Sequence, residues 1–156
     1  MIRSGSPKAL WCYNFELTAR IRSCTALDIF SLDGEVPETK LKGHTADISN
    51  ICEYDWYEFI MYSDNIAKYP DDRWKLGRYL GPADDVGSAM CYWILRENGE
   101  VIPRSTIRGL TEEELLDPVQ TAARNSFNNN VITRLGSPAT EDDFDPDHLT
   151  PTYDQF

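Results

Sequence analysis

LGRYLGPADDVGSAMCYWILRENGEVIPRSTIR, from Leu76 to Arg108, is the stretch that decides the fold of this chain. Its first part, Leu76–Leu80, has the half-apolar composition of a short strand. Gly81-Pro82 is expected to end that strand, because proline has no N–H to donate to a sheet. Its second part, Ala89–Arg96, is rich in aromatic and β-branched residues, which suit a half-buried pleated surface. Both parts therefore predict β-strands.

Asn98-Gly99 predicts a hairpin between the second strand and a third one, Val101–Ile107. An Asn-Gly pair tolerates positive φ and fits a two-residue type I′ turn. Pro103 within the returning strand favours a position at the edge of a sheet. An earlier strand is expected at Trp56–Tyr62, where apolar residues partly alternate. These strands predict an α+β fold built around a small antiparallel β-barrel.

The N-terminal segment predicts an amphipathic helix followed by a loop-rich connector. Ser6-Pro7 is typical of a helix start, since serine caps free N–H groups and proline suits the first turn. The helix is expected to end near Thr25. One apolar line runs along it at spacings of three and four, and a second line lies beside it. The first line is Leu10, Tyr13 or Asn14, Leu17, Ile21 and Cys24, and the second is Trp11 and Phe15.

Two segments with turn patterns flank the barrel. Within the connector, Pro37 and Gly43 mark a one-turn helix, PETKLKG. After the barrel, Thr111 and Glu114 have the spacing of a capping box that begins a short helix. Either Pro118 ends this helix, or it opens a second short helix through Arg124, after which the residues 125–130 lose periodicity.

The last residues, EDDFDPDHLTPTYDQF, are acidic, interrupted by proline and poor in aliphatic side chains. This composition predicts a disordered tail. Two interpretations of the tail stay open, an inert linker and a docking motif. The motif would use its scattered apolar residues, Phe144, Leu149, Tyr153 and Phe156.

Four motifs follow one another in a particular order: SPKALW before a helix, VPETKLKGHTADISNICEY, LGRYLGP, and RSTIR before an acidic segment. This order resembles the end of the integrase core and the region after it in copia-type retrotransposon Pol polyproteins, from Ser6 to Glu114. The resemblance implies a C-terminal remnant of a ribonuclease H-like core at residues 1–53. It implies a barrel of Src-homology-3 type at residues 54–110, and a short helix with an acidic disordered tail at residues 111–156.

The resemblance also implies that the chain is not an enzyme. Integrases of this kind hold two divalent metal ions with three carboxylates, and in the family pattern all three precede the SPKALW segment. This chain begins five residues before Ser6, so none of the three has a counterpart. We therefore expect a non-catalytic fragment of a protein whose activity is DNA integration, either cut from it or read from an internal methionine of a decayed element.

Charge is unevenly distributed along the chain. Residues 1–110 carry 13 Lys+Arg and 16 Asp+Glu, a net of −3, whereas residues 111–156 carry 2 and 10, a net of −8, which together give −11. Binding to phosphate backbones depends mainly on Lys and Arg, so weak or no nucleic-acid binding is expected. If the barrel makes such contacts, the candidate residues are Lys75, Arg78, Arg104 and Arg108.

Neither a metal site nor a cofactor site is predicted. The cysteines show no Cys-x-x-Cys pair, so we expect them to be reduced and buried. His44 lies in a polar segment and is expected to face solvent. The adjacent acids Asp71-Asp72 and Asp84-Asp85 are either metal-binding carboxylates or, as we favour, turn residues that bond their own backbone.

Three classes of function remain open. The first is the non-catalytic integrase fragment, the second is a stand-alone small barrel that binds peptide or nucleic acid, and the third is an enzyme that uses His44 or the acidic pairs. The wide apolar surface of the N-terminal helix also predicts self-association. No apolar run of membrane-spanning length and no signal peptide is visible, so we expect an intracellular location, in the cytoplasm or nucleus.

Overall fold

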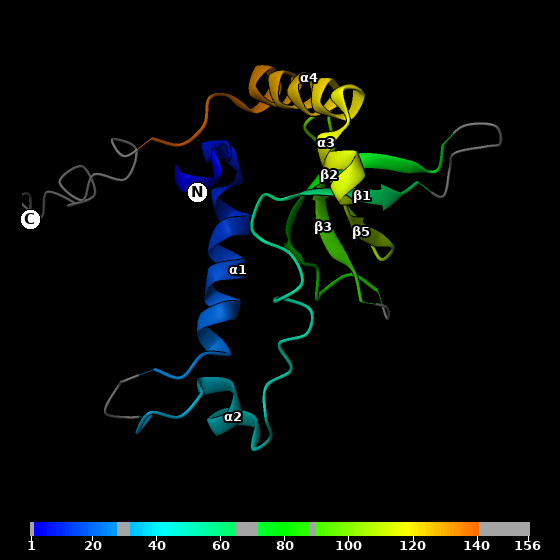
Figure 1. Ribbon diagram of the computed structural model, residues 1–156. Helices are drawn as coiled ribbons and strands as arrows, with labels where there is room; N and C mark the ends of the chain where they lie inside the picture. The colour runs from blue at the N-terminus through cyan, green and yellow to red at the C-terminus, as the bar shows by residue number, and fades with distance from the viewer. Residues whose placement is uncertain (1, 28–31, 65–71, 88–89, 141–156) are drawn as a thin grey trace, which may run out of the picture.

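The computed structural model describes residues 2–27, 32–64, 72–87 and 90–140 (Figure 1). Helices and an antiparallel sheet share this part of the chain, so the fold is α+β. The elements are η1 (Ile2–Ser4), η2 (Lys8–Leu10), α1 (Trp11–Ser23), α2 (Pro37–Lys42), β1 (Phe59–Ser63), β2 (Trp74–Pro82), β3 (Tyr92–Leu95), β4 (Val101–Arg104), β5 (Ile107–Gly109), α3 (Glu112–Leu116) and α4 (Pro118–Leu135).

The sheet has five strands in the order β4-β3-β2-β1-β5, and all neighbouring strands are antiparallel. Only Ser105 and Thr106 separate the two outer strands in the sequence. Three Cα–Cα steps reach about 11 Å, whereas the outer strands of a flat five-stranded sheet would be about 19 Å apart. The sheet must therefore curl strongly. In the described part of the chain β4 and β5 do not pair, so the sheet is not closed.

Strand boundaries differ from the expected ones where backbone geometry intervenes. β2 continues through Pro82 instead of ending at Leu80. The backbone hydrogen bonds between β2 and the chain leading into β1 end at Tyr79, so Pro82 is paired only with Tyr92 of β3 and is tolerated there. Tyr57 has a φ of 65°, and β1 begins only after it. The expected third strand is two strands, β4 and β5, with the corner between them.

The β3–β4 hairpin is confirmed, but its turn is not type I′. Gly99 has a φ of 84°, whereas Asn98 is not among the described residues with positive φ. Gly99 N–H donates to Arg96 O (3.0 Å), and Arg96 N–H donates to Glu100 O (2.8 Å). These bonds define a three-residue loop with glycine in the left-handed conformation at its end. Pro103 lies on the outer strand β4, as predicted.

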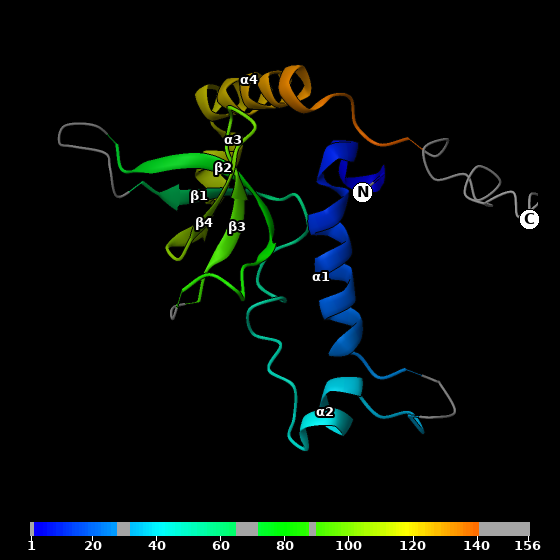
Figure 2. The ribbon, with the colours of Figure 1, turned by 180° about the vertical axis from the view of Figure 1, so that it is seen from behind.

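The curled sheet has an apolar core on each face. Ile102 and Ile107, half-buried residues of the outer strands, line the inner core, which also contains Ile60, Tyr62, Tyr79, Tyr92 and Ile94. The outer core lies between the sheet and the helices α1 and α4 (Figures 1 and 2). It contains Leu10, Tyr57, Leu80, Leu95, Phe127 and Val131.

α1 lies against the sheet with one of its two apolar lines. Leu17 is 6% exposed and packs over Gly81 of β2, whose φ of 125° favours glycine, and a Cβ added there would make an ordinary contact with the Leu17 Cβ at 3.5 Å. Tyr13 makes an edge contact with Trp93, with ring centroids 5.9 Å apart. The predicted Ser6 cap is wrong. Among the described residues no side chain caps η2 or α1, and the buried Ser6 hydroxyl instead accepts a hydrogen bond from Trp56 Nε1 (3.2 Å).

The short helices follow the predicted patterns. α2 ends at Gly43, which is left-handed with a φ of 74°. At the start of α3, Thr111 and Glu114 form the capping box: Thr111 Oγ1 accepts from Glu114 N (3.2 Å), and Glu114 Oε2 accepts from Thr111 N (2.9 Å). Both predictions are confirmed.

α4 is the largest departure from the sequence prediction. Asp117 accepts a hydrogen bond from Val119 N (3.0 Å) and opens the helix, which continues to Leu135 instead of Arg124. The residues expected to be irregular are helical because Phe127 and Val131 are 2% and 0% exposed against the outer face of the sheet. Tertiary burial outweighs the low helix propensity of the asparagines.

The two ends of the described chain meet. Pro7 forms an isolated antiparallel bridge with Pro138, and Ala139 N–H donates to Ser6 O (3.0 Å). Residues from all three predicted segments, 1–53, 54–110 and 111–156, contribute to the outer core. The proposed division therefore remains a prediction about evolutionary origin, because in the structure these segments fold together.

Replacement of Gly99 by valine should destabilise the protein by about 1 kcal/mol or more, because a β-branched residue resists positive φ. At position 99 an added Cβ would also lie 3.1 Å from the Arg134 Cβ. Thermal unfolding should show a melting temperature lower by at least about 2–4 °C. Gly43→Val is the control, because its φ is also positive but nothing lies within 4 Å of the added Cβ. An unchanged melting temperature for Gly99→Val would contradict the turn assignment.

Candidate functional site

A groove of about 890 Å³ lies between α4 and the sheet. Residues of β1, β2 and the turn after β3 form one wall, and one face of α4 forms the other. Its lining is Tyr62, Lys75, Leu76, Arg96, Glu97, Asn98, Ala123, Ser126, Phe127, Asn130, Thr133 and Arg134. The size and the mixture of apolar floor and polar rim are typical of binding sites.

Charged groups at the groove are balanced by neighbouring acids. Lys75 Nζ pairs with Asp64 Oδ2 (2.8 Å), and this hydrogen bond raises the pKa of Lys75. Arg96 pairs with Glu100 (3.0 Å). Asn130 Nδ2 donates to Glu97 Oε1 (2.6 Å) and thereby connects α4 to the hairpin. The groove therefore offers paired charges, amides and the exposed Arg134, which suit a polar backbone more than an isolated ion.

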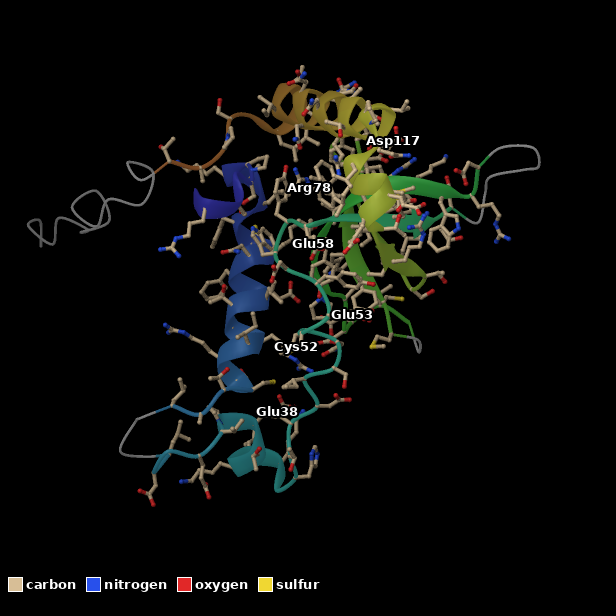
Figure 3. The ribbon with its side chains drawn as sticks, in the orientation of Figure 1. Glu38, Cys52, Glu53, Glu58, Arg78 and Asp117 are labelled. Carbon is tan, nitrogen blue, oxygen red and sulfur yellow. The ribbon has the colours of Figure 1, made fainter. Side chains whose placement is uncertain are left out.

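Arg78, one of the four predicted contact residues, fastens α4 to the sheet (Figure 3). Its guanidinium lies 3.4 Å from the centroid of the Phe59 ring and donates to the backbone carbonyl of Tyr57 and to Asn128 Oδ1 (2.8 Å). Burial lowers the pKa of Arg78 to about 10. Among the described residues no carboxylate pairs with it, so aromatic rings and neutral oxygens replace water around this cation.

Arg108, the second predicted contact, is occupied by the cap of α3. Its guanidinium donates to both carboxylate oxygens of Glu114, at 2.7 and 2.8 Å, and lies 5.1 Å from the ring centroid of Trp74. These bonds, followed by the backbone N–H of Thr111, lower the pKa of Glu114 to about 2. The pair fixes the corner where β5 leads into α3.

The four predicted cations do not form one patch. Lys75 and Arg104 lie at opposite ends of the sheet along β2. Lys75 is near the start of β2, opposite Tyr62 of β1. Arg104 is opposite Tyr92 of β3, which in turn is opposite Pro82 at the end of β2. Arg78 and Arg108 point to the other face of the sheet. Arg104 donates to Pro103 O (2.8 Å). A nucleic-acid contact by these residues stays a prediction, with no shared surface to support it.

The other sequence candidates are scattered. His44 is exposed and lies 3.2 Å from Thr45 O. Asp72 Oδ1 accepts from Trp74 N (2.9 Å), the local turn bond that we expected, and Asp84 pairs with Arg20 (3.5 Å). Asp71 lies outside the described residues. Within the described ranges no three His, Cys, Asp or Glu side chains gather as metal ligands would.

The cysteines are free thiols, but the prediction that they are buried is wrong. Cys12 and Cys52 are exposed, and Cys24 and Cys91 are half-buried. Cys12 lies on the solvent side of α1, and Cys52 in the connector. Cys24 Sγ donates to Glu38 Oε2 (3.2 Å), and burial followed by this hydrogen bond raises the pKa of the thiol. Glu38 lies on α2 (Figure 3).

Sequence reasoning missed the helical wall of the groove, including Ser126, Asn130 and Arg134. The available signal was the spacing of four between Phe127, Val131 and Leu135, which places them on one side of a helix. The run of asparagines obscured it.

α1 retains an uncovered apolar line. Trp11 is 56% exposed and Phe15 66%, and Ile21, at the far end of the line that packs on the sheet, is 43% exposed. The expected self-association through this helix stays a prediction, and the surface available for it is the Trp11 line, since Leu10 and Leu17 are buried against the sheet.

Searches against family models, curated proteins and solved structures returned no match to this chain. None of the described helices has both the length and the apolar character needed to cross a membrane.

Replacing Arg78 by alanine should lower the free energy of unfolding by about 2 kcal/mol, because hydrogen bonds to a charged group and the aromatic contacts are lost. Arg78→Lys should rescue little of this, since an ammonium group cannot reproduce the planar stacking. Asn128→Ala should show part of the loss, and its exposed neighbour Asn129→Ala is the matched control. Chemical denaturation measures all four, and an Arg78→Ala protein as stable as the parent would contradict this role.

Replacing Glu114 by glutamine should destabilise the protein at neutral pH and have less effect in acid. The folded pKa of Glu114 is lowered from 4.5 to about 2. Its stabilising contribution is therefore complete above about pH 5 and is lost as the pH falls through about 2. The stability difference between the two proteins should shrink over this range, and a difference that is constant from pH 7 to pH 3 would contradict the assignment.

Proposed function

We propose that this chain is a non-catalytic piece of a copia-type retrotransposon Pol polyprotein, in which the curled sheet is a barrel of Src-homology-3 type. The observation that carries the proposal is the two-residue connection between β4 and β5. It brings the outer strands of a five-stranded antiparallel sheet to one corner, as a small barrel requires. The ordered motifs from Ser6 to Glu114 lead independently to the same barrel.

In this proposal the chain supports DNA integration by folding and binding, and not by catalysis. The family's catalytic carboxylates belong to segments that precede the matched region. Asp72 and Asp84, the acids that could have served instead, bond the backbone of a turn and an arginine. These roles are structural.

A second candidate function, a small barrel that binds peptide or nucleic acid, is favoured by the groove under α4. Lys75, Arg96 and Arg134 reach its rim, and Leu76 and Phe127 line its apolar floor. The two candidates are compatible, since a polyprotein segment without catalytic residues still needs a surface that positions it. The groove is the surface we assign to that task.

The purified chain should neither nick DNA nor transfer strands with magnesium or manganese, because the resemblance places the required carboxylates outside the matched region. A plasmid-nicking assay with both metals measures this. Metal-dependent nicking that persists through purification and disappears in Asp84→Asn would overturn the non-catalytic assignment.

Nucleic-acid binding should be weak, fall steeply with salt and increase when the tail loses its charge. Truncation at Thr111 would remove Phe127 and Val131 from the core, so the cleaner change replaces the acids of residues 141–156 by their amides. This raises the net charge from −11 to −5, since the segment has six acids. Fluorescence anisotropy with a short DNA at low salt should show higher affinity.

Arg134→Gln in the groove should reduce this binding more than Arg73→Gln, an exposed control outside the groove lining. Equal losses in the two variants would mean that binding depends on net charge and not on the groove. Unchanged affinity after neutralisation of the tail would show that the tail does not oppose binding.

A further inference from the structure

One face of α1 is exposed along its whole length. Residues at spacings of three and four point away from the sheet and are all exposed: Lys8, Trp11, Cys12, Phe15, Thr18, Ala19 and Arg22. Trp11 and Phe15 form an aromatic pair at its centre, with ring centroids 6.5 Å apart. Two large aromatic side chains more than half exposed on one face mark an interaction surface.

This aromatic pair lies in the basic part of an acidic chain. Residues 1–27 contain Arg3, Lys8, Arg20 and Arg22 and a single acid, Glu16, a net of +3 against −11 for the whole protein. Lys8 and Arg22 stand at the two ends of the exposed face. A binding partner that complements this surface is acidic and contributes apolar side chains.

The chain itself contains such a segment, and it starts beside this surface. Residues 141–156 include six acids, no Lys or Arg, and the four apolar residues Phe144, Leu149, Tyr153 and Phe156. Residue 139 donates its N–H to Ser6 O (3.0 Å), just before α1, and Figures 1 and 2 both show the segment after α4 passing this end of the helix.

The distances permit contact along the whole helix. α1 has 13 residues, about 20 Å of helix, whereas 16 extended residues span up to about 55 Å.

We propose that residues 141–156 bind in cis to the exposed face of α1, with Phe144 and the other apolar residues on Trp11 and Phe15 and the acids beside Lys8 and Arg22. Individual exposed ion pairs contribute little. Attachment through Ala139 makes the contact intramolecular, which raises the effective concentration to the millimolar range. The acidic tail then covers the apolar surface and neutralises the basic segment.

A second copy of α1 is a poorer occupant of the same face. If two copies pair antiparallel, Lys8 of one lies near Arg22 of the other, and if they pair parallel each cation meets itself. Like charges face each other in both cases. The tail brings the opposite charge.

Acrylamide quenching of tryptophan fluorescence tests the proposal in the full chain. Trp11 is exposed and the other three tryptophans are half-buried, so quenching reports mainly on Trp11. Replacing the tail acids by amides together with Phe144→Ser should raise the quenching constant by about twofold, and 0.5 M salt should raise it in the parent chain, because screening weakens the ion pairs. In a Trp11→Phe background the difference should vanish.

Glu112→Gln/Glu113→Gln, which removes exposed acids from α3, is the matched control and should leave quenching unchanged. Quenching of Trp11 that is equally high in the parent and in the tail variant would overturn the proposal. Sedimentation at several concentrations distinguishes binding in cis from dimerisation. If Trp11 is protected from quenching only at concentrations where the chain dimerises, a second copy occupies the face, and this result would also overturn binding in cis.

Discussion

The two-residue connection between β4 and β5 is the constraint on which the rest of this structure depends. It forces five short strands to curl, which gives the sheet a concave face that its own side chains fill and a convex face that they do not. The concave face is crowded. An added Cβ on Gly77 would lie 2.6 Å from Ile94 Cγ2, so β2 needs glycine where Tyr62 and Ile94 meet. The convex face is left for the helices.

Covering the convex face explains the positions of α1 and α4. A sheet this small gains stability only if its outer apolar residues are also buried, and the two helices come from opposite ends of the chain to do so. The Arg78 side chain lies on the same convex face, and α4 covers it. A half-buried cation without a carboxylate is costly unless other groups compensate it, and the Tyr57 carbonyl, Asn128 and the Phe59 ring do so for its two terminal nitrogens, whereas Nε has no hydrogen-bond partner among the described residues.

The sequence predicted local features well and long-range ones poorly. The capping box at Thr111 and the hairpin at Gly99 depend on residues close in the chain, so their patterns are visible in it. The length of α4 and the burial of Ser6 depend on partners that are distant in the sequence, such as Trp56 for Ser6 and the sheet residues Phe59 and Leu95 for Phe127. The spacing of four between Phe127, Val131 and Leu135 is compatible with a helix, but it does not reveal which surface these residues pack against.

The candidate site shows the same division. Lys75, predicted from charge, does line the groove, but Arg96, Asn130 and Arg134 join it only because α4 crosses the sheet. Arg78 and Arg108 were selected for their positive charge, and the fold uses both charges internally, one beneath α4 and one in the α3 cap. The amino-acid composition gives the number of cations. It does not reveal which of them already have partners in the tertiary structure.

The two helices on the convex face differ in what they leave in water. α4 buries Phe127, its one aromatic residue, together with Val131, and leaves two aliphatic side chains, Val119 (73% exposed) and Ile132 (41%), in water beside its polar residues. α1 buries Leu10 and Leu17 and still exposes Trp11 and Phe15, although neither residue contributes to a core cluster. Burying each such side chain is worth about 1.5–3 kcal/mol, which for two residues is a large fraction of the 5–15 kcal/mol that stabilises a typical domain. Because the fold forms both core clusters without burying these two aromatic residues, the free energy of burying them remains available for binding.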